Sequence, residues 1–200
     1  VFTGGEPTFR NDLTDLIRHA EKNGQVTGLL TDGLRLTDNN YRHALLDSGL
    51  DHIMIVLDLG SRQAWESVRD VLAEDIALTV HITITPDNKD MVLNGLAKLA
   101  EMGLKKLSLS ISDQVLEGVL KTAREKVADL NMTLVWDLPV PYSAFNPISL
   151  ELRESMNLVD GSGKAWLYVE PDGDVLPAQG INKVIGNLLN ESWESIWAKC

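Results

Sequence analysis

The sequence of 200 residues contains a single cysteine, Cys200, and no apolar run near the ~18 residues that span a membrane. One thiol cannot form a disulfide or a multi-cysteine metal cage within the chain. Basic residues are also few: 18 Lys and Arg stand against 29 Asp and Glu, which gives a net charge of −11. We therefore expect a cytoplasmic protein that has neither nucleic acid nor a membrane surface as a partner.

The two ends of the sequence predict a fragment of a longer protein. Val1-Phe2-Thr3 is typical of the end of a buried strand, and no Met or targeting segment precedes it. The last residues, 192–200, follow an amphipathic helical pattern without a stop signal. A strand edge left uncovered beside Val1 would favour self-association through that edge.

Short runs rich in β-branched residues alternate with helical patterns along most of the chain. After Val1–Thr3, the predicted strands are Val26–Thr31, His52–Asp58, Ala77–Thr85, Lys105–Ser110 and Asn131–Asp137. The predicted helices are Asp12–Lys22, Asn39–Asp47, Ala64–Ala73, Lys89–Met102 and Gln114–Asp129. This alternation predicts an α/β fold with a parallel sheet, either an open doubly wound sheet or a barrel.

Polar residues and glycines recur where the predicted strands end, which is where ligands bind in both architectures. Gly4-Gly5-Glu6-Pro7 follows the first strand directly. The two glycines would let a ligand approach the backbone closely, and Glu6 could accept hydrogen bonds from a ligand ammonium group. Turn formation and helix capping are the alternative roles for such residues.

Gly4-Gly5-Glu6-Pro7, a helix and then Thr31-Asp32-Gly33 together resemble the radical S-adenosylmethionine (radical SAM) superfamily. In that family, a Gly-Gly-Glu-Pro segment binds the amino group of SAM, and a Thr-Asn-Gly turn ends the next strand. The sequence departs from the family in having Asp32 where the family has Asn, and Val56 where a Ser-x-Asp motif ending at Asp58 would have its Ser.

The resemblance implies a partial (βα) TIM-like barrel and a set of SAM-binding residues. These are Gly4, Gly5, Glu6, Pro7, Thr31, Asp32, Gly33, Asp58 and Thr85. It also implies that SAM, bound at a [4Fe-4S] cluster, is reductively cleaved to a 5′-deoxyadenosyl radical. The three cluster cysteines would lie upstream of Val1, so the resemblance implies no catalytic or metal-binding residue in this chain, which we expect to be inactive by itself.

The segment after Asp137 follows a different pattern. Residues 138–147 contain three of the seven prolines, which predicts a linker or substrate-side loop over 138–160. Residues 165–177 predict a β-hairpin around Pro171-Asp172-Gly173. With the helical pattern that follows, residues 161–200 resemble the SPASM or twitch extension of the same superfamily, with Ala178 in place of a cluster cysteine.

The remaining candidates are weaker. The four histidines show no metal-ligand spacing, so structural or surface roles are expected for all of them, including His81. Trp136 and Asp137, at the end of the last predicted strand, are candidate substrate contacts.

Two functions remain open. The first is a radical SAM enzyme, of which this chain is a part, that modifies a peptide or a small cofactor precursor. The second is a degenerate, non-catalytic barrel that binds peptide or SAM.

Overall fold

The computed structural model describes residues 1–135, 163–165, 167–170, 172–178, 181 and 183–199. The chain divides into two compact units, Val1–Tyr142 and Ser143–Cys200, and each is described by itself. Within the described residues, every helix is too short or too polar to cross a membrane. The predicted segment 138–160 lies outside the described residues.

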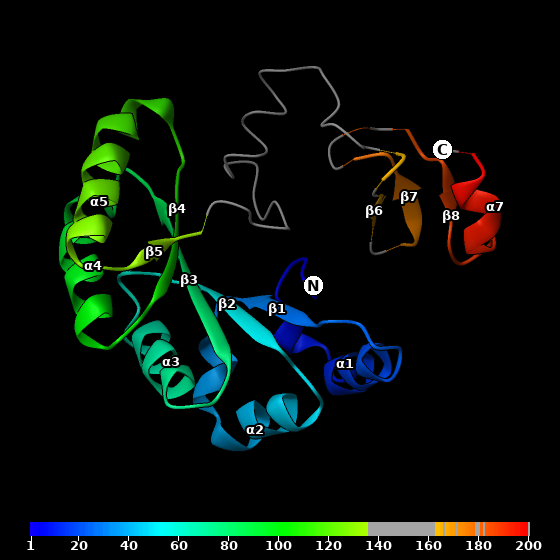
Figure 1. Ribbon diagram of the computed structural model, residues 1–200, viewed down its shortest axis with the longest axis horizontal. Coiled ribbons are helices and arrows are strands. Elements are labelled where there is room, and N and C mark those ends of the chain that lie inside the picture. Colours follow the sequence, from blue (N-terminus) through cyan, green and yellow to red (C-terminus); the bar gives the residue numbers. More distant parts are fainter. Residues whose placement is uncertain (136–162, 166, 171, 179–180, 182, 200) are drawn as a thin grey trace. The chain divides into compact units, whose positions relative to one another are not determined.

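The first unit is a parallel sheet of five strands connected by helices (Figure 1). Its strands are β1 (Gly28–Thr31), β2 (His52–Val56), β3 (Ala77–Ile84), β4 (Lys106–Ile111) and β5 (Thr133–Leu134). Its α-helices are α1 (Leu13–Lys22), α2 (Asn39–Asp47), α3 (Arg62–Leu72), α4 (Val92–Glu101) and α5 (Glu117–Asp129). Four short 3₁₀ turns complete it: η1 (Pro7–Phe9), η2 (Leu34–Thr37), η3 (Lys89–Met91) and η4 (Gln114–Leu116). The predicted α/β class is confirmed.

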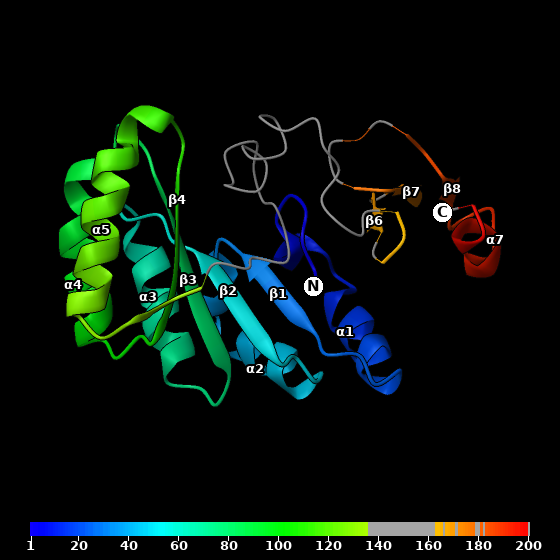
Figure 2. The same ribbon diagram turned by 45° about the horizontal axis from the view of Figure 1, so that its top comes forward.

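The strand order favours a barrel over a doubly wound sheet. The strands pair in sequence order, from β1 to β5, with no reversal. Because crossovers between parallel strands are almost always right-handed, an unreversed order places every helix on the same face. Figure 2 shows the helices along one side of the curved sheet. This arrangement is consistent with the predicted partial barrel.

The helices begin and end close to their predicted positions because the sequence carries the signals for both. Asp38 accepts the backbone N–H groups of Asn40 and Tyr41 and so caps α2. Ser61 caps α3 in the same way by accepting the N–H of Ala64. The helix therefore begins at Arg62, two residues before its predicted first residue. The predicted helices at 89–102 and 114–129 each begin with a 3₁₀ turn instead.

The two faces of the sheet differ in chemistry. Ile53, Ile55, Val80 and Ile82 are at most 1% exposed and pack in the core beneath the helices. Alternate residues point to the opposite face. There, His52, Met54 and Val56 of β2 are only half-buried, whereas β3 and β4 carry histidine, threonine and serine. β2 is therefore fully buried on its helix-covered face only.

The first residues of the chain extend the sheet by one bridge. Phe2 pairs in parallel with Leu29, through hydrogen bonds of 2.6 Å to the Gly28 carbonyl and 3.1 Å from the Leu30 N–H. The predicted strand at Val1–Thr3 is thus represented by a single residue. Its position places the residues that follow, from Thr3 onward, at the carboxyl end of β1.

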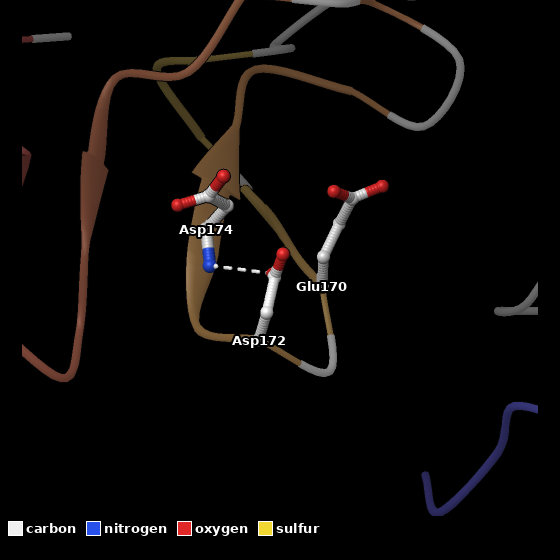
Figure 3. Close-up of side chains that lie close together, drawn as sticks. All are labelled: Glu170, Asp172 and Asp174. Atoms are coloured by element: carbon white, nitrogen blue, oxygen red, sulfur yellow. Dashed lines mark hydrogen bonds between the residues drawn. The ribbon is translucent and has the colours of Figure 1, made fainter.

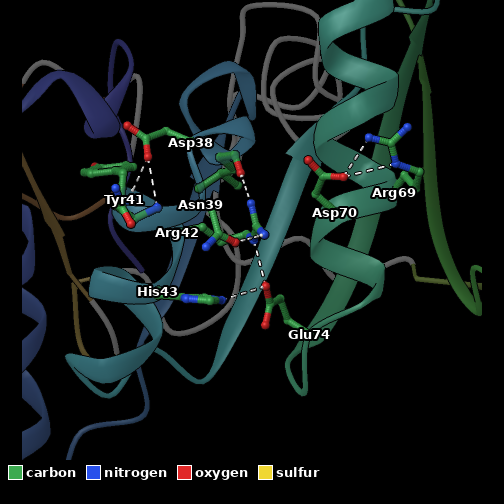
Figure 4. A network of polar contacts seen from close by, with 10 residues as sticks. Asp38, Asn39, Tyr41, Arg42, His43, Arg69, Asp70 and Glu74 are labelled. Carbon is green, nitrogen blue, oxygen red and sulfur yellow. Dashed lines mark hydrogen bonds and ion pairs between the residues drawn. The ribbon is translucent and has the colours of Figure 1, made fainter.

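A buried arginine joins α2 to the end of α3 (Figure 4). Arg42 is 7% exposed. It donates to the Leu36 carbonyl at 2.7 Å, to Asn39 Oδ1 at 2.7 Å and to Glu74 Oε1 at 2.8 Å. His43 lies 3.3 Å from the same Glu74 oxygen. The Arg42 guanidinium holds the pKa of Glu74 below its usual value, so the pair is charged at neutral pH.

The second unit contains the predicted hairpin and a third strand that the sequence did not indicate. β6 (Tyr168–Val169) and β7 (Asp174–Leu176) pair antiparallel, and β8 (Gly186–Asn187) pairs antiparallel with β7. The short helix α7 (Trp193–Trp197) follows, capped by Ser192. Ala178, for which the resemblance implies a cysteine in the extension, is fully buried.

Candidate functional site

The Gly-Gly-Glu-Pro segment forms an exposed loop at the carboxyl edge of the sheet. Gly4 and Gly5 have φ angles of +91° and +49°, a region that disfavours other residues. Among the residues that the structure describes, no heavy atom lies within 4 Å of where a Cβ would be on either glycine, so this part of the chain leaves the backbone open on its outer side. Pro7 begins η1 and is buried. The loop therefore has room for a ligand next to its main chain.

The Glu6 side chain joins this loop to the turn after β1. Its Oε1 atom accepts from the Thr8 N–H at 2.9 Å, the Thr8 hydroxyl at 2.7 Å and the Thr31 hydroxyl at 2.8 Å. Its Oε2 atom accepts from the backbone N–H of Asp32 at 2.7 Å. Oε1 thus receives three donors, whereas Oε2 receives only this one from the described residues, and the second lone pair of Oε2 can accept another donor.

The Thr31-Asp32-Gly33 turn is built by its own side chains. The Thr31 hydroxyl accepts the Gly33 N–H at 3.0 Å while it donates to Glu6. Asp32 Oδ1 accepts the N–H of Leu34 at 2.9 Å, a bond that an asparagine at this position could make equally well. Gly33 has a φ of +79°, and a Cβ there would lie 2.8 Å from Ser67 Oγ. The role of Gly33 is therefore in the turn and its packing on α3.

The carboxyl groups of Glu6 and Asp32 are close neighbours in the site. Burial is the main cause of the raised pKa of Asp32; the Leu34 N–H lowers that pKa, and the nearby charge of Glu6 raises it. Two neighbouring carboxyl groups at a partly buried edge favour a cationic group between or beside them. A ligand ammonium group fits this requirement.

The other two predicted cofactor residues make local turns in the structure. Asp58, after β2, is exposed and accepts the Gly60 N–H at 2.9 Å. Thr85 follows β3. Its N–H donates to Asn88 Oδ1 at 2.9 Å, and its hydroxyl oxygen accepts the Asn88 N–H at 3.3 Å. Both follow strands at the predicted edge, but they have no hydrogen bond to the Glu6 group. Trp136 and Asp137 lie outside the described residues.

His81 is buried on the helix-free face of the sheet. His81 Nδ1 lies 3.0 Å from the Ser108 hydroxyl, and Nε2 lies 3.1 Å from each of the hydroxyls of Thr83 and Ser110. Burial lowers the pKa of His81 to about 4, so the ring is neutral at neutral pH. In the sequence, the alternation of His81 and Thr83 with apolar Val80 and Ile82 was the signal that these two polar side chains share one face of the strand.

A groove of about 530 Å³ lies on the outer, helical side between α3 and α4. The Trp65 indole donates to the Leu59 carbonyl at 3.0 Å, and the Lys98 ammonium lies 3.8 Å from the Trp65 ring centroid. The contact between Lys98 and Trp65 connects α4 to α3 across the groove.

Three carboxylates of the C-terminal hairpin lie close together (Figure 3). One oxygen each of Glu170, Asp172 and Asp174 lies within 4.8 Å of the others. Asp172 accepts the Asp174 N–H at 3.2 Å, and Asp174 Oδ1 accepts from Asn187 at 2.8 Å. These bonds stabilise the turn around Gly173, so the cluster has a structural role without an ion.

The comparisons with known proteins point in the direction of the sequence resemblance. A scan against models of known protein families gave no match. The chain is similar to proteins named PqqA peptide cyclase: from Streptomyces rochei, 28% identical over 98% of this chain and 61% of that protein; from Methylocella silvestris, 23% identical over 98% and 59%; and from Ruegeria pomeroyi, 28% identical over 91% and 54%.

These relatives support the radical SAM resemblance at modest identity. The chain spans 54–61% of the length of these three proteins.

Proposed function

We propose that this chain is part of a radical SAM protein that modifies a peptide, and that its two loops at the carboxyl edge hold the methionyl end of SAM. The observation that supports this most directly is the Glu6 carboxylate, which bonds to the Thr31 hydroxyl and the Asp32 N–H. It thereby connects the two segments that carry the family resemblance. The peptide class of substrate is suggested by the names of the relatives.

The residues present fit SAM. Gly4 and Gly5 expose backbone N–H and C=O groups to a polar ligand, Glu6 Oε2 has capacity for an ammonium donor, and Asp32 adds negative charge nearby. When SAM is bound at a reduced cluster, its cleavage supplies a carbon radical that abstracts hydrogen from a substrate. The part of this chain is to bind and orient the methionyl group and to exclude water.

The residues present do not fit the [4Fe-4S] cluster. Such a cluster requires several thiolates, and the sequence offers one cysteine. We therefore propose SAM binding for this chain and derive no reaction step from it.

The same proposal includes the organisation of the chain. Residues 1–137 form a partial barrel, 138–160 a linker and 161–200 a twitch-like extension. Further ligand contacts in this proposal are Asp58, Thr85, Trp136 and Asp137.

Binding of SAM by this chain tests the proposal. Isothermal titration calorimetry should show SAM binding by the wild type and at least about tenfold weaker binding by Glu6→Gln, because an amide NH₂ would face donors of the loop. Glu125→Gln, an exposed change on α5, is the matched control and should bind like the wild type. Failure of the wild type to bind SAM would refute the proposal.

Turnover separates the enzyme from the non-catalytic alternative. The protein as its gene encodes it would be reconstituted anaerobically with iron and sulfide and then supplied with SAM and a reductant. Formation of 5′-deoxyadenosine supports the enzyme. SAM binding without this product supports the degenerate barrel, which Val56, Asp32 and Ala178 favour.

A further inference from the structure

The carbonyl of Thr8 receives two side-chain donors from the segment after β1. Arg35 Nη1 donates to this oxygen, and the Tyr41 hydroxyl donates to it at 3.2 Å. The Arg35 guanidinium carbon also lies 4.1 Å from the centroid of the Tyr41 ring. Two donors that contact each other therefore converge on one backbone oxygen of the Gly-Gly-Glu-Pro loop.

Thr8 links these donors to Glu6. Its N–H and hydroxyl both donate to the Glu6 carboxylate, while its carbonyl faces Arg35 and Tyr41. Thr8 is fully buried, so loss of either set of partners leaves polar groups without water to replace them. Gly4 and Gly5, in contrast, are exposed and have no packing neighbours on their outer side among the described residues. The conformation of the glycines thus depends on how firmly Thr8 is held.

The charges around Tyr41 and Arg35 leave both side chains able to donate a hydrogen bond. Burial raises the pKa of Tyr41, the Arg35 charge lowers it and the Glu6 charge raises it, with a net upward direction. The hydroxyl therefore keeps its proton at neutral pH. Arg35 is charged under all ordinary conditions, and its cation lies in the same neighbourhood as the carboxyl groups of the site.

We propose that Arg35 and Tyr41 are positioning residues that fix the ligand-binding conformation of Gly4-Gly5-Glu6 through the Thr8 carbonyl. They hold the loop in its bound form before a ligand arrives, which lowers the ordering cost of binding. The identity of the ligand rests on the proposed function. The effect of Arg35 and Tyr41 on the loop does not rest on the proposed function. The positioning role and the proposed function can therefore be refuted separately.

Hydrogen exchange of the ligand-free chain tests the effect on the loop. The amides of Thr8, Phe9 and Arg10 all donate within this segment. Tyr41→Phe keeps the ring and removes one donor, and Arg35→Gln removes the charged one. Each should speed exchange of these amides by about fivefold, the effect of losing roughly one net hydrogen bond. Arg62→Gln, which alters a guanidinium 93% exposed on α3, is the control.

The expected pattern is local. Amides of β3 and β4 should exchange at the wild-type rate in all variants, and the unfolding midpoint of Tyr41→Phe should stay close to that of the wild type. Unchanged exchange in the loop, or an equal increase throughout the sheet, would overturn the proposal.

Affinity for SAM provides the second readout. If the wild type binds SAM, Tyr41→Phe and Arg35→Gln should each raise the Kd by about fivefold, and Arg35→Lys, which restores a donor, should recover part of the loss. Equal Kd values for wild type and variants would overturn the positioning role. If the wild type does not bind SAM, the proposed function fails, and the exchange experiment alone decides whether Arg35 and Tyr41 order the loop.

Discussion

Glu6 and Thr31 lie 25 positions apart in the sequence and are joined by a hydrogen bond of 2.8 Å from the threonine hydroxyl to the carboxylate. The parallel pairing of Phe2 with Leu29 brings them together. It places the loop that contains Glu6 at the carboxyl end of β1, and Thr31 is the last residue of β1. A carboxylate that could have been free for a ligand is thus already part of the framework. What remains for a ligand is one acceptor position of Oε2 and the open glycine backbone.

Replacement of Gly33 by alanine should destabilise the first unit through two effects. Alanine is strained at a φ of +79°, and its Cβ would lie 2.8 Å from Ser67 Oγ. Gly103→Ala is a matched control, because its φ is +90° and no heavy atom lies within 4 Å of the added carbon. We expect a loss of about 1 kcal/mol for Gly103→Ala and at least about 2 kcal/mol for Gly33→Ala in urea unfolding. Equal losses would show that the contact with Ser67 carries no cost.

His81 should make stability depend on pH between about 4 and 6.5. Burial lowers its pKa from 6.5 to about 4 in the folded chain. In this window the unfolded chain binds a proton that the folded chain does not, so stability rises with pH. The contribution is fully present above pH 6.5 and is lost as the pH falls toward 4; its size is on the order of 3 kcal/mol.

A substitution isolates the contribution of His81. His81→Gln keeps hydrogen-bonding groups beside the hydroxyls of Ser108 and Ser110 but cannot titrate. Urea unfolding at a series of pH values between 4 and 7 should show a flatter dependence for this variant than for the wild type. Val26→Ala, an exposed change that removes no titratable group, should keep the wild-type dependence. The same slope in His81→Gln and the wild type would contradict the assignment.

The Arg42 network should matter far more for stability than an exposed ion pair. The side chains of Arg42 and Glu74 are 9% and 20% exposed, whereas those of Arg62 and Glu66 are 93% and 37% exposed. Arg42→Ala removes the guanidinium that donates to the Leu36 carbonyl and to the Glu74 carboxylate, at a cost of about 3 kcal/mol. Arg62→Ala should cost less than about 0.5 kcal/mol. Chemical unfolding of the two variants at neutral pH, side by side, measures the difference.

The sequence predicted those parts of the molecule that depend on local pattern. Asn39–Asp47 is a helix with the predicted bounds because Asp38 caps it and no later proline or glycine interrupts it. Contacts between distant segments were not predictable in the same way. The bonds from Arg35 and Tyr41 to Thr8 depend on how η2 and α2 pack against the first loop, and nothing in the spacing of these residues indicates it. Likewise, β8 is a strand because it pairs with β7, although Gly186 and Asn187 have low strand propensity.

Asp32 stands where the family resemblance has asparagine, and its replacement distinguishes its charge from its role in the turn. Asp32→Asn keeps an oxygen that accepts the Leu34 N–H, so the turn should persist. Because the folded pKa of Asp32 is raised above 3.8, its ionisation costs stability as the pH rises through that folded pKa. The variant should therefore be as stable as the wild type at pH 7, or more stable by up to about 0.5 kcal/mol.

Asp32→Ala removes the turn bond as well and should lose about 1 kcal/mol. If the charge of Asp32 attracts a cationic group of SAM, Asp32→Asn should bind SAM more weakly despite its unchanged stability. Calorimetry of both variants with SAM, after thermal unfolding has established their stability, gives the answer. Wild-type affinity in Asp32→Asn would show that Asp32 contributes only the turn, and that the attraction for an ammonium group belongs to Glu6.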